Sequence, residues 1–119
     1  MRLSFLLFAA TAMAGSALAA SADGNFRMVG AGAVACSQIT ADLAADPANA
    51  TEIGSWVAGY ATATNRNTAD TWDLMGEGGL DGYFAAVQAD CAANPEKTLE
   101  NAAFDVLNAN YETRTVTKP

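Results

Sequence analysis

Ile-Gly-Ser-Trp-Val-Ala-Gly-Tyr-Ala, residues 53–61, is the segment with the clearest structural pattern in this chain. Its apolar side chains fall at spacings of i, i+3, i+4, i+7 and i+8, which is the stripe of an amphipathic helix. Thr51 is a suitable N-cap, and Glu52 favours the positive end of such a helix. We therefore predict a helix that begins after Thr51 and ends at the polar run 64–67.

Similar apolar spacing predicts three more helices around this segment. The first covers about 33–45 and ends at Asp46, because the residue that precedes a proline is disfavoured in helical conformation. The third covers 80–93. Asn94 and Pro95 then suit the cap and the first position of a fourth helix. The predicted fold class is all-α, a small four- to five-helix single domain stapled by one disulfide.

The N-terminus has the pattern of a secretory signal peptide. Arg2 supplies a positive charge, the apolar stretch over 3–15 is too short to span a bilayer, and small residues follow it. We predict cleavage near Ala19 to Ala22 and a periplasmic location. The chain then divides into a cleaved signal peptide over 1–20 and a single helical domain over 21–119. Its ordered core is expected at about 33–112, with a frayed polar tail over 113–119.

Cys36 and Cys91 are the only two cysteines of the chain. Disulfides form and persist in the periplasm, so an exported chain of this size is expected to join them. The bond would close a loop of roughly 55 residues and stabilise the fold by about 4 kcal/mol in the loop-entropy model. Two buried free thiols are the alternative. With the predicted helices, the disulfide ties the first helix to the third.

The chain is acidic, with 13 Asp and Glu residues against 6 Lys and Arg residues and a formal net charge of −7 at pH 7. This balance argues against nucleic acid or an anionic membrane surface as a partner. There is no histidine, so no ordinary side chain titrates between pH 5 and 8. Free carboxyl groups titrate near pH 4. In stronger acid the net charge of the chain therefore becomes positive.

The residue patterns of common catalytic sites are missing from the sequence. Without histidine, a Ser-His-Asp or Cys-His triad is excluded, and there is no phosphate-binding loop or CxxC pair. Paired carboxylates leave a glycosidase-type acid and base open, but a domain this small has little room for the cleft. We expect no enzyme activity, no metal and no cofactor. Four carboxylates lack calcium-loop spacing and are interpreted as a solvated acidic loop: Asp70, Asp73, Glu77 and Asp81.

Several of these features occur together in one known family. Cys36 in the first helix is followed by Trp-Val-Ala-Gly-Tyr at 56–60 and by an acidic loop. Next come Ala-Ala-Val-Gln-Ala-Asp-Cys at 85–91, Asn-Pro at 94–95 and a final amphipathic helix. From about Cys36 to Tyr111, the chain resembles the HdeA/HdeB family of periplasmic acid-stress chaperones, small all-helical proteins with one disulfide.

The resemblance implies a folded dimer near neutral pH and a disordered, chaperone-active monomer in strong acid. It also implies that denaturing proteins are bound through exposed apolar surface and are released on neutralisation. The candidates for a client or dimer surface are Trp56, Val57, Tyr60, Tyr83 and Phe84. For Trp56 and Tyr60, the helical spacing favours packing in the core.

The function we predict is that of a periplasmic acid-stress chaperone, a holdase that binds denaturing proteins at low pH. Its expected partners are unfolded periplasmic proteins and a second copy of the chain, with no nucleic acid and no membrane span. The alternative is a periplasmic immunity or inhibitor-type protein with one specific protein partner. Small exported helical domains without catalytic groups occur in both classes.

Overall fold

The computed structural model describes residues 20–119 and confirms an all-α fold. The predicted signal-peptide residues 1–19 lie outside the described part of the chain. Within residues 20–119 there is no strand, and the elements in chain order are η1 (Gly30–Ala33), α1 (Cys36–Ala45), α2 (Asn49–Asn67), α3 (Gly79–Ala93), α4 (Leu99–Ala109) and η2 (Tyr111–Thr113), where η marks a 3-10 helix.

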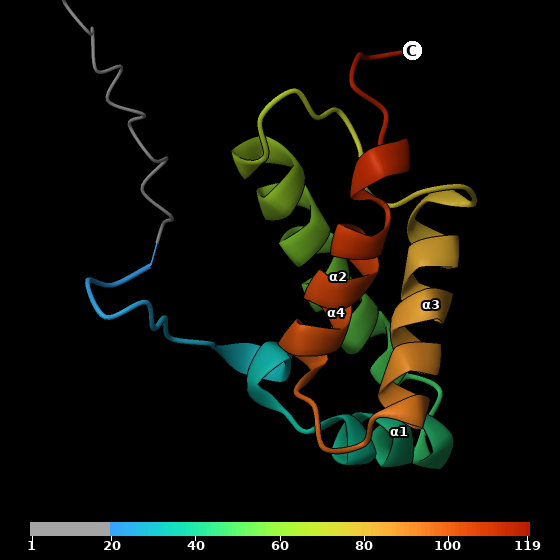
Figure 1. Ribbon diagram of the computed structural model, residues 1–119. Helices are drawn as coiled ribbons and strands as arrows, with labels where there is room; N and C mark the ends of the chain where they lie inside the picture. Colours follow the sequence, from blue (N-terminus) through green and yellow to red (C-terminus); the bar gives the residue numbers. More distant parts are fainter. Residues whose placement is uncertain (1–19) are drawn as a thin grey trace, which may run out of the picture.

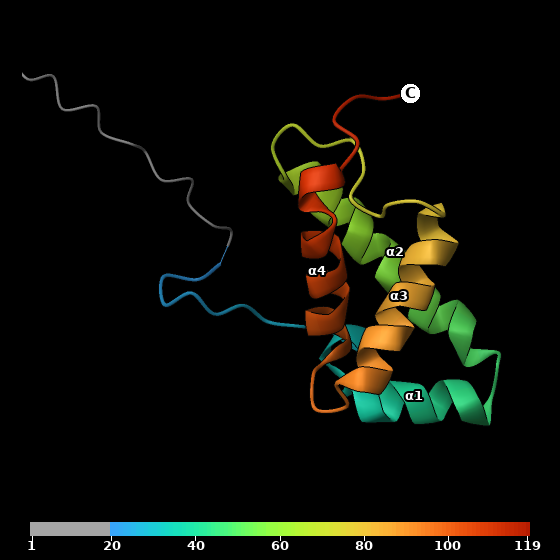
Figure 2. The same ribbon diagram turned by 45° about the vertical axis from the view of Figure 1, so that its right-hand side comes forward.

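The helices form a small bundle, and α1 lies across one end of it. In the two views, α3 and α4 stand side by side, α2 crosses behind them, and α1 lies across the base (Figures 1 and 2). The main packed pairs are α3 with α4 and α1 with α3. The segment before η1 leads away from the base, and the C-terminus lies at the opposite end of the bundle. This arrangement brings the start of α1 to the end of α3.

The core lies where the four helices face one another. The stripe predicted at 53–61 is confirmed, because Ile53, Val57 and Ala61 are buried on α2. Burying one large aliphatic or aromatic side chain contributes about 1.5–3 kcal/mol. The largest fully buried side chains come from all four helices and are Tyr83, Leu99, Leu107, Val57, Val87, Cys36 and Cys91.

The first helix begins at Cys36, later than the predicted start at 33. The backbone N–H of Cys36 donates to the carbonyl of Lys97 at 2.8 Å, and Leu99 N–H donates to the carbonyl of Val34 at 2.9 Å. These bonds to the α3–α4 connection hold Val34 in an extended conformation, so the helix starts only after it. The end of α1 before the Asp46-Pro47 pair is as predicted.

The second helix begins at Asn49, so the prediction that Thr51 is its N-cap is wrong. The Asp46 carboxylate accepts the backbone N–H of Ala48 at 2.9 Å, and Asn49 Nδ2 donates to the carbonyl of Asp42 at 2.9 Å. Both contacts stabilise the chain just before the predicted start. They extend α2 toward α1 and leave Thr51 within the first turn.

The Asn94-Pro95 pair does not begin the fourth helix, contrary to our prediction. Asn94 is the C-cap of α3, and its Nδ2 donates to the carbonyl of Asp90 at 3.1 Å. The fourth helix begins at Leu99 with Thr98 as N-cap. Thr98 Oγ1 accepts a backbone N–H of the first turn at 3.2 Å. Asn94, which we predicted to begin α4, therefore ends α3.

Arg114 and Thr115 are paired with the α2–α3 loop, within the segment 113–119 that we predicted to be frayed. Thr115 and Asp73 form an isolated antiparallel bridge, in which Thr115 N–H donates to the carbonyl of Asp73 at 3.0 Å. Arg114 Nε donates to Thr71 Oγ1 at 3.1 Å. The loop thus supplies hydrogen-bond partners that the local sequence of the tail does not reveal.

Candidate functional site at the disulfide and the α2–α4 groove

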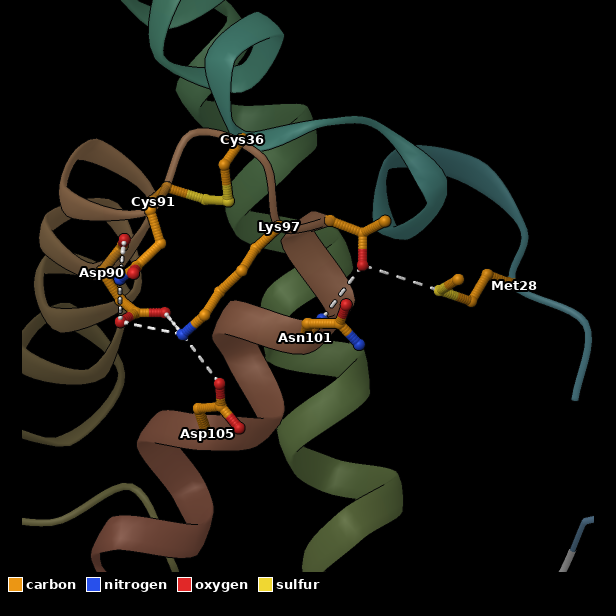
Figure 3. The surroundings of a disulfide bond; sticks show 9 residues. Met28, Cys36, Asp90, Cys91, Lys97, Asn101 and Asp105 are labelled. Atoms are coloured by element: carbon orange, nitrogen blue, oxygen red, sulfur yellow. Dashed lines mark hydrogen bonds and ion pairs between the residues drawn. A yellow bond between two sulfur atoms is a disulfide. The ribbon is translucent and has the colours of Figure 1, made fainter. Parts of the chain in front are cut away.

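Cys36 and Cys91 form a disulfide, which confirms the predicted pairing (Figure 3). The two Cα atoms are 4.7 Å apart, and both cysteines are buried. Cys36 opens α1, and Cys91 lies in the last turn of α3. The bond therefore closes the base of the bundle, where α1 meets the end of α3.

An ionic cluster of Asp90, Lys97 and Asp105 lies beside this disulfide (Figure 3). Lys97 Nζ is 3.0 Å from Asp90 Oδ2 and 2.8 Å from Asp105 Oδ2. The hydrogen bond to Asp105 raises the pKa of Lys97 most, and the hydrogen bond to Asp90 is the second cause. Since Asp90 precedes Cys91 and Asp105 belongs to α4, the cluster joins α3 to α4 next to the covalent bond.

The ionic cluster is open to water. The exposed fractions of its side chains are 27% for Lys97, 23% for Asp90 and 50% for Asp105. Ion pairs at such positions are screened by solvent and salt, so their contribution to stability is small. The cluster instead positions the α3–α4 connection.

A groove runs between α2 and α4 on the side that faces the N-terminal segment. Its volume is about 610 Å³. Glu100 is buried in it, with 5% of the residue exposed, whereas Phe104 is 47% exposed. We call this site the α2–α4 groove. Its lining includes Phe26, Tyr60, Thr64, Glu100, Asn101 and Phe104.

Two hydrogen bonds hold the Glu100 carboxylate in the α2–α4 groove. Tyr60 OH donates to Oε1 at 2.6 Å, and Asn101 Nδ2 donates to Oε2 at 2.9 Å. Burial raises the pKa of Tyr60, and the hydrogen bond to Glu100 raises it further. Burial raises the pKa of Tyr83 as well, and the charge of Glu100 adds to that effect. Both phenols therefore stay protonated well into alkaline solution.

Trp56 supports Tyr60 from the direction of η1. The two rings stack with centroids 5.2 Å apart and an angle of 16° between their planes. The Trp56 indole N–H donates to the carbonyl of Val29 at 3.0 Å. The stack and this hydrogen bond fix the ring of Tyr60, whose hydroxyl holds Glu100.

The five residues predicted as a client or dimer surface lie in different environments. Val57 and Tyr83 are buried in the core, where Tyr83 OH donates to the carbonyl of Ala103 at 3.1 Å. Trp56, Tyr60 and Phe84 are partly buried against that core. In the folded chain, only these last three side chains offer part of their surface to a partner.

Sequence reasoning missed the two residues that give the α2–α4 groove its character, Glu100 and Phe104. Phe104 could have been recognised from the sequence, because it is an aromatic residue that lies outside the apolar stripe of the fourth helix. Glu100 carried none, since a glutamate in the first turn of a helix is ordinary at an exposed position. Its burial depends on Tyr60, which comes from another helix.

Two kinds of feature, a metal-ligating cluster and a membrane-spanning helix, are missing from the described residues. Between residues 20 and 119, no group of three potential metal-ligating side chains comes together, and no helix is long and apolar enough to cross a membrane. No family model, curated protein or solved structure matches this chain. Within residues 20–119, the features described above are the disulfide, the ionic cluster and the α2–α4 groove.

Proposed function

We propose that this chain is an exported acid-stress chaperone, a holdase that binds denaturing proteins in the periplasm at low pH. The observation that carries the proposal is the position of the ionic cluster beside the disulfide. Asp90 is the neighbour of Cys91, and its carboxylate is bound to Lys97. Contacts that acid can remove are thus placed next to a bond that acid leaves intact.

Acid acts on the cluster in a defined direction. Protonation removes the charges of Asp90 and Asp105 and leaves the ammonium group of Lys97 without its counterions. The whole chain, with 13 acidic and 6 basic residues, becomes positive at the same time. Repulsion between cations loosens the contact of α3 with α4, and loss of the cluster adds a small effect, whereas the disulfide keeps α1 attached to α3.

Loosening of the bundle provides the surface that a holdase needs. Trp56, Tyr60 and Phe84 are already partly accessible in the folded chain. Separation of the helices adds core residues such as Val57 and Tyr83, which are buried in the native state. Apolar surface of this kind binds denatured chains by the hydrophobic effect. Neutralisation restores the cluster, and the disulfide speeds refolding by keeping α1 near α3.

Aggregation of a mixed periplasmic extract at pH 2–3, and again after neutralisation, tests the proposal. The purified oxidised chain is expected to suppress light scattering in both phases. The Asp90→Asn/Asp105→Asn variant keeps oxygen acceptors for Lys97 but removes the two negative charges, as protonation does, so its activity is expected to begin at a higher pH. Glu77→Gln/Asp81→Asn is the charge-matched control and should behave like the wild type. No suppression by a stoichiometric excess of the wild type would refute the proposal.

The α2–α4 groove favours a second candidate function, that of an immunity or inhibitor-type protein with one specific partner. A preformed groove with a buried carboxylate and exposed Phe104 suits selective recognition at neutral pH. Recovery of a single tight partner at pH 7, without protection of the extract in acid, would support this function over the first. The homodimer stays a prediction, which sedimentation at pH 7 tests directly.

A further inference from the structure

Glu100 is the one buried charged residue among residues 20–119. In that range, the ion pairs are those of Lys97 with Asp90 and Asp105, so no basic side chain neutralises Glu100. Its carboxylate accepts hydrogen bonds only from neutral side-chain donors, the hydroxyl of Tyr60 and the amide of Asn101. A buried carboxylate without a cationic partner is costly. An ionised Glu100 therefore has no cationic partner among the described residues.

The N-terminus of α4 offsets part of that charge. Glu100 lies in the first turn of α4, where the helix dipole supplies about half of a positive charge. The remainder is negative and lies in a groove of about 610 Å³. Binding pockets typically combine an apolar lining with a few convergent polar groups, and the α2–α4 groove has this composition.

Three aromatic rings line the same groove as Glu100: Phe26, Tyr60 and Phe104. Phe26 is 59% exposed and Phe104 is 47% exposed, whereas Glu100 is 5% exposed. Glu100 is thus the buried member of this lining, and Phe26 and Phe104 are exposed members. Aromatic faces attract cations, and methylated ammonium groups are commonly bound between such rings. A ring-lined groove over a buried carboxylate combines both attractions.

We propose that the α2–α4 groove binds a methylated ammonium group. The cationic nitrogen lies over the Glu100 carboxylate, and its methyl groups contact the rings of Tyr60, Phe26 and Phe104. A methylated ammonium suits this groove better than a primary ammonium, because its methyl groups add contact with the three rings. The group can belong to a free choline-type molecule or to a methylated lysine of a protein. This site is independent of the proposed acid-stress function.

Calorimetric titration of the purified chain with choline at pH 7 and low salt tests the site. The matched probe is the neutral isostere of choline, in which a tert-butyl group replaces the trimethylammonium group. Saturable binding of choline is expected, with affinity at least about tenfold above that of the isostere. A trimethyl-lysine peptide forms the second arm, and tighter binding of either cation identifies its source and supports the site.

Two variants locate the binding in the α2–α4 groove. Glu100→Gln keeps an oxygen acceptor for Tyr60 but removes the charge, and Phe104→Ala removes an exposed residue without touching the core. Each is expected to weaken choline binding by about tenfold. Glu112→Gln, an exposed carboxylate outside the groove, should leave binding unchanged. Equal binding of choline and its isostere, unaltered binding by Phe104→Ala, or no binding at millimolar choline would each overturn the proposal.

Discussion

The indole of Trp56 occupies the space that a side chain at position 32 would need. A Cβ atom added to Gly32 would lie 2.0 Å from Trp56 Cζ2, far inside any allowed contact. Gly32 is buried in η1, and the adjoining Val29 carbonyl accepts the indole N–H. The glycine of η1 and the tryptophan of α2 therefore specify one another, although they are far apart in the sequence.

Gly32→Ala is expected to destabilise the fold. The indole must move to make room, which weakens its hydrogen bond to Val29 and costs about 1–3 kcal/mol of unfolding free energy. Urea unfolding followed by tryptophan fluorescence measures the loss. Gly59→Ala is the matched control, because a Cβ at position 59 meets no atom within 4 Å. In the middle of α2 it should stabilise by about 0.5–1 kcal/mol. Equal stability of the two variants would show that Trp56 does not exclude a side chain at position 32.

Tyr60→Phe is expected to cost about 1–3 kcal/mol, because it removes a donor from the buried Glu100 carboxylate. Tyr83→Phe removes a bond to the neutral carbonyl of Ala103 and should cost less, about 0.5–1.5 kcal/mol. Thermal unfolding at pH 7 ranks the two variants. If Tyr60→Phe is no less stable than the wild type, the hydroxyl of Tyr60 does not stabilise the buried Glu100 carboxylate.

The observed N-cap of α4, Thr98, and the predicted N-cap of α2, Thr51, provide another test. Thr98→Ala is expected to lower the unfolding free energy by about 0.5–2 kcal/mol, because Thr98 Oγ1 accepts a backbone N–H at the start of α4. Thr51→Ala should change it by less than about 0.5 kcal/mol, since Thr51 is exposed within α2. Chemical denaturation of both variants measures the two losses, and a larger loss in Thr51→Ala than in Thr98→Ala would favour the predicted start of α2 at Thr51.

Alkaline solution is expected to destabilise the domain. The pKa values of Tyr60, Tyr83 and Lys97 are all raised in the fold. A raised pKa means that the folded state holds the proton more tightly, so the added stability is present below about pH 10 and is lost as the pH rises further. For each of the two phenols, the loss is at most about 1.4 kcal/mol per pH unit, and solvent screening reduces it.

Urea midpoints at pH 8, 10 and 11 measure this dependence. The midpoint should fall between pH 10 and 11 in the wild type and fall less steeply in Tyr83→Phe, which has one titrating group fewer. Tyr111→Phe is a suitable control, because Tyr111 is 39% exposed. A midpoint that stays constant up to pH 11 would contradict the role given to the buried phenols.

The helices were predictable because their apolar spacing is a local property of the sequence. Ile53, Val57 and Ala61 lie on the buried face of α2 as the spacing indicated. The disulfide was predictable as well, since the chain has only two cysteines and a predicted export signal. These predictions required no knowledge of which helices touch.

Helix ends and the α2–α4 groove were not predictable, because both depend on contacts between distant segments. Lys97 and Pro95 supply the carbonyls that set the start of α1, and Asn94 caps the end of α3 instead of the start of α4. Glu100 is buried only because Tyr60 of another helix reaches it. No periodicity within one helix contains this information.

The central claim is that the disulfide keeps an acid-loosened chain active as a holdase. The direct measurement is light scattering of a periplasmic extract at pH 2–3 with the oxidised wild type or with Cys36→Ser/Cys91→Ser. The wild type is expected to suppress aggregation and the variant to lose most of that activity, with a neutral unfolding free energy lower by roughly 2–5 kcal/mol. Equal suppression by both proteins, or none by the wild type, would contradict the claim.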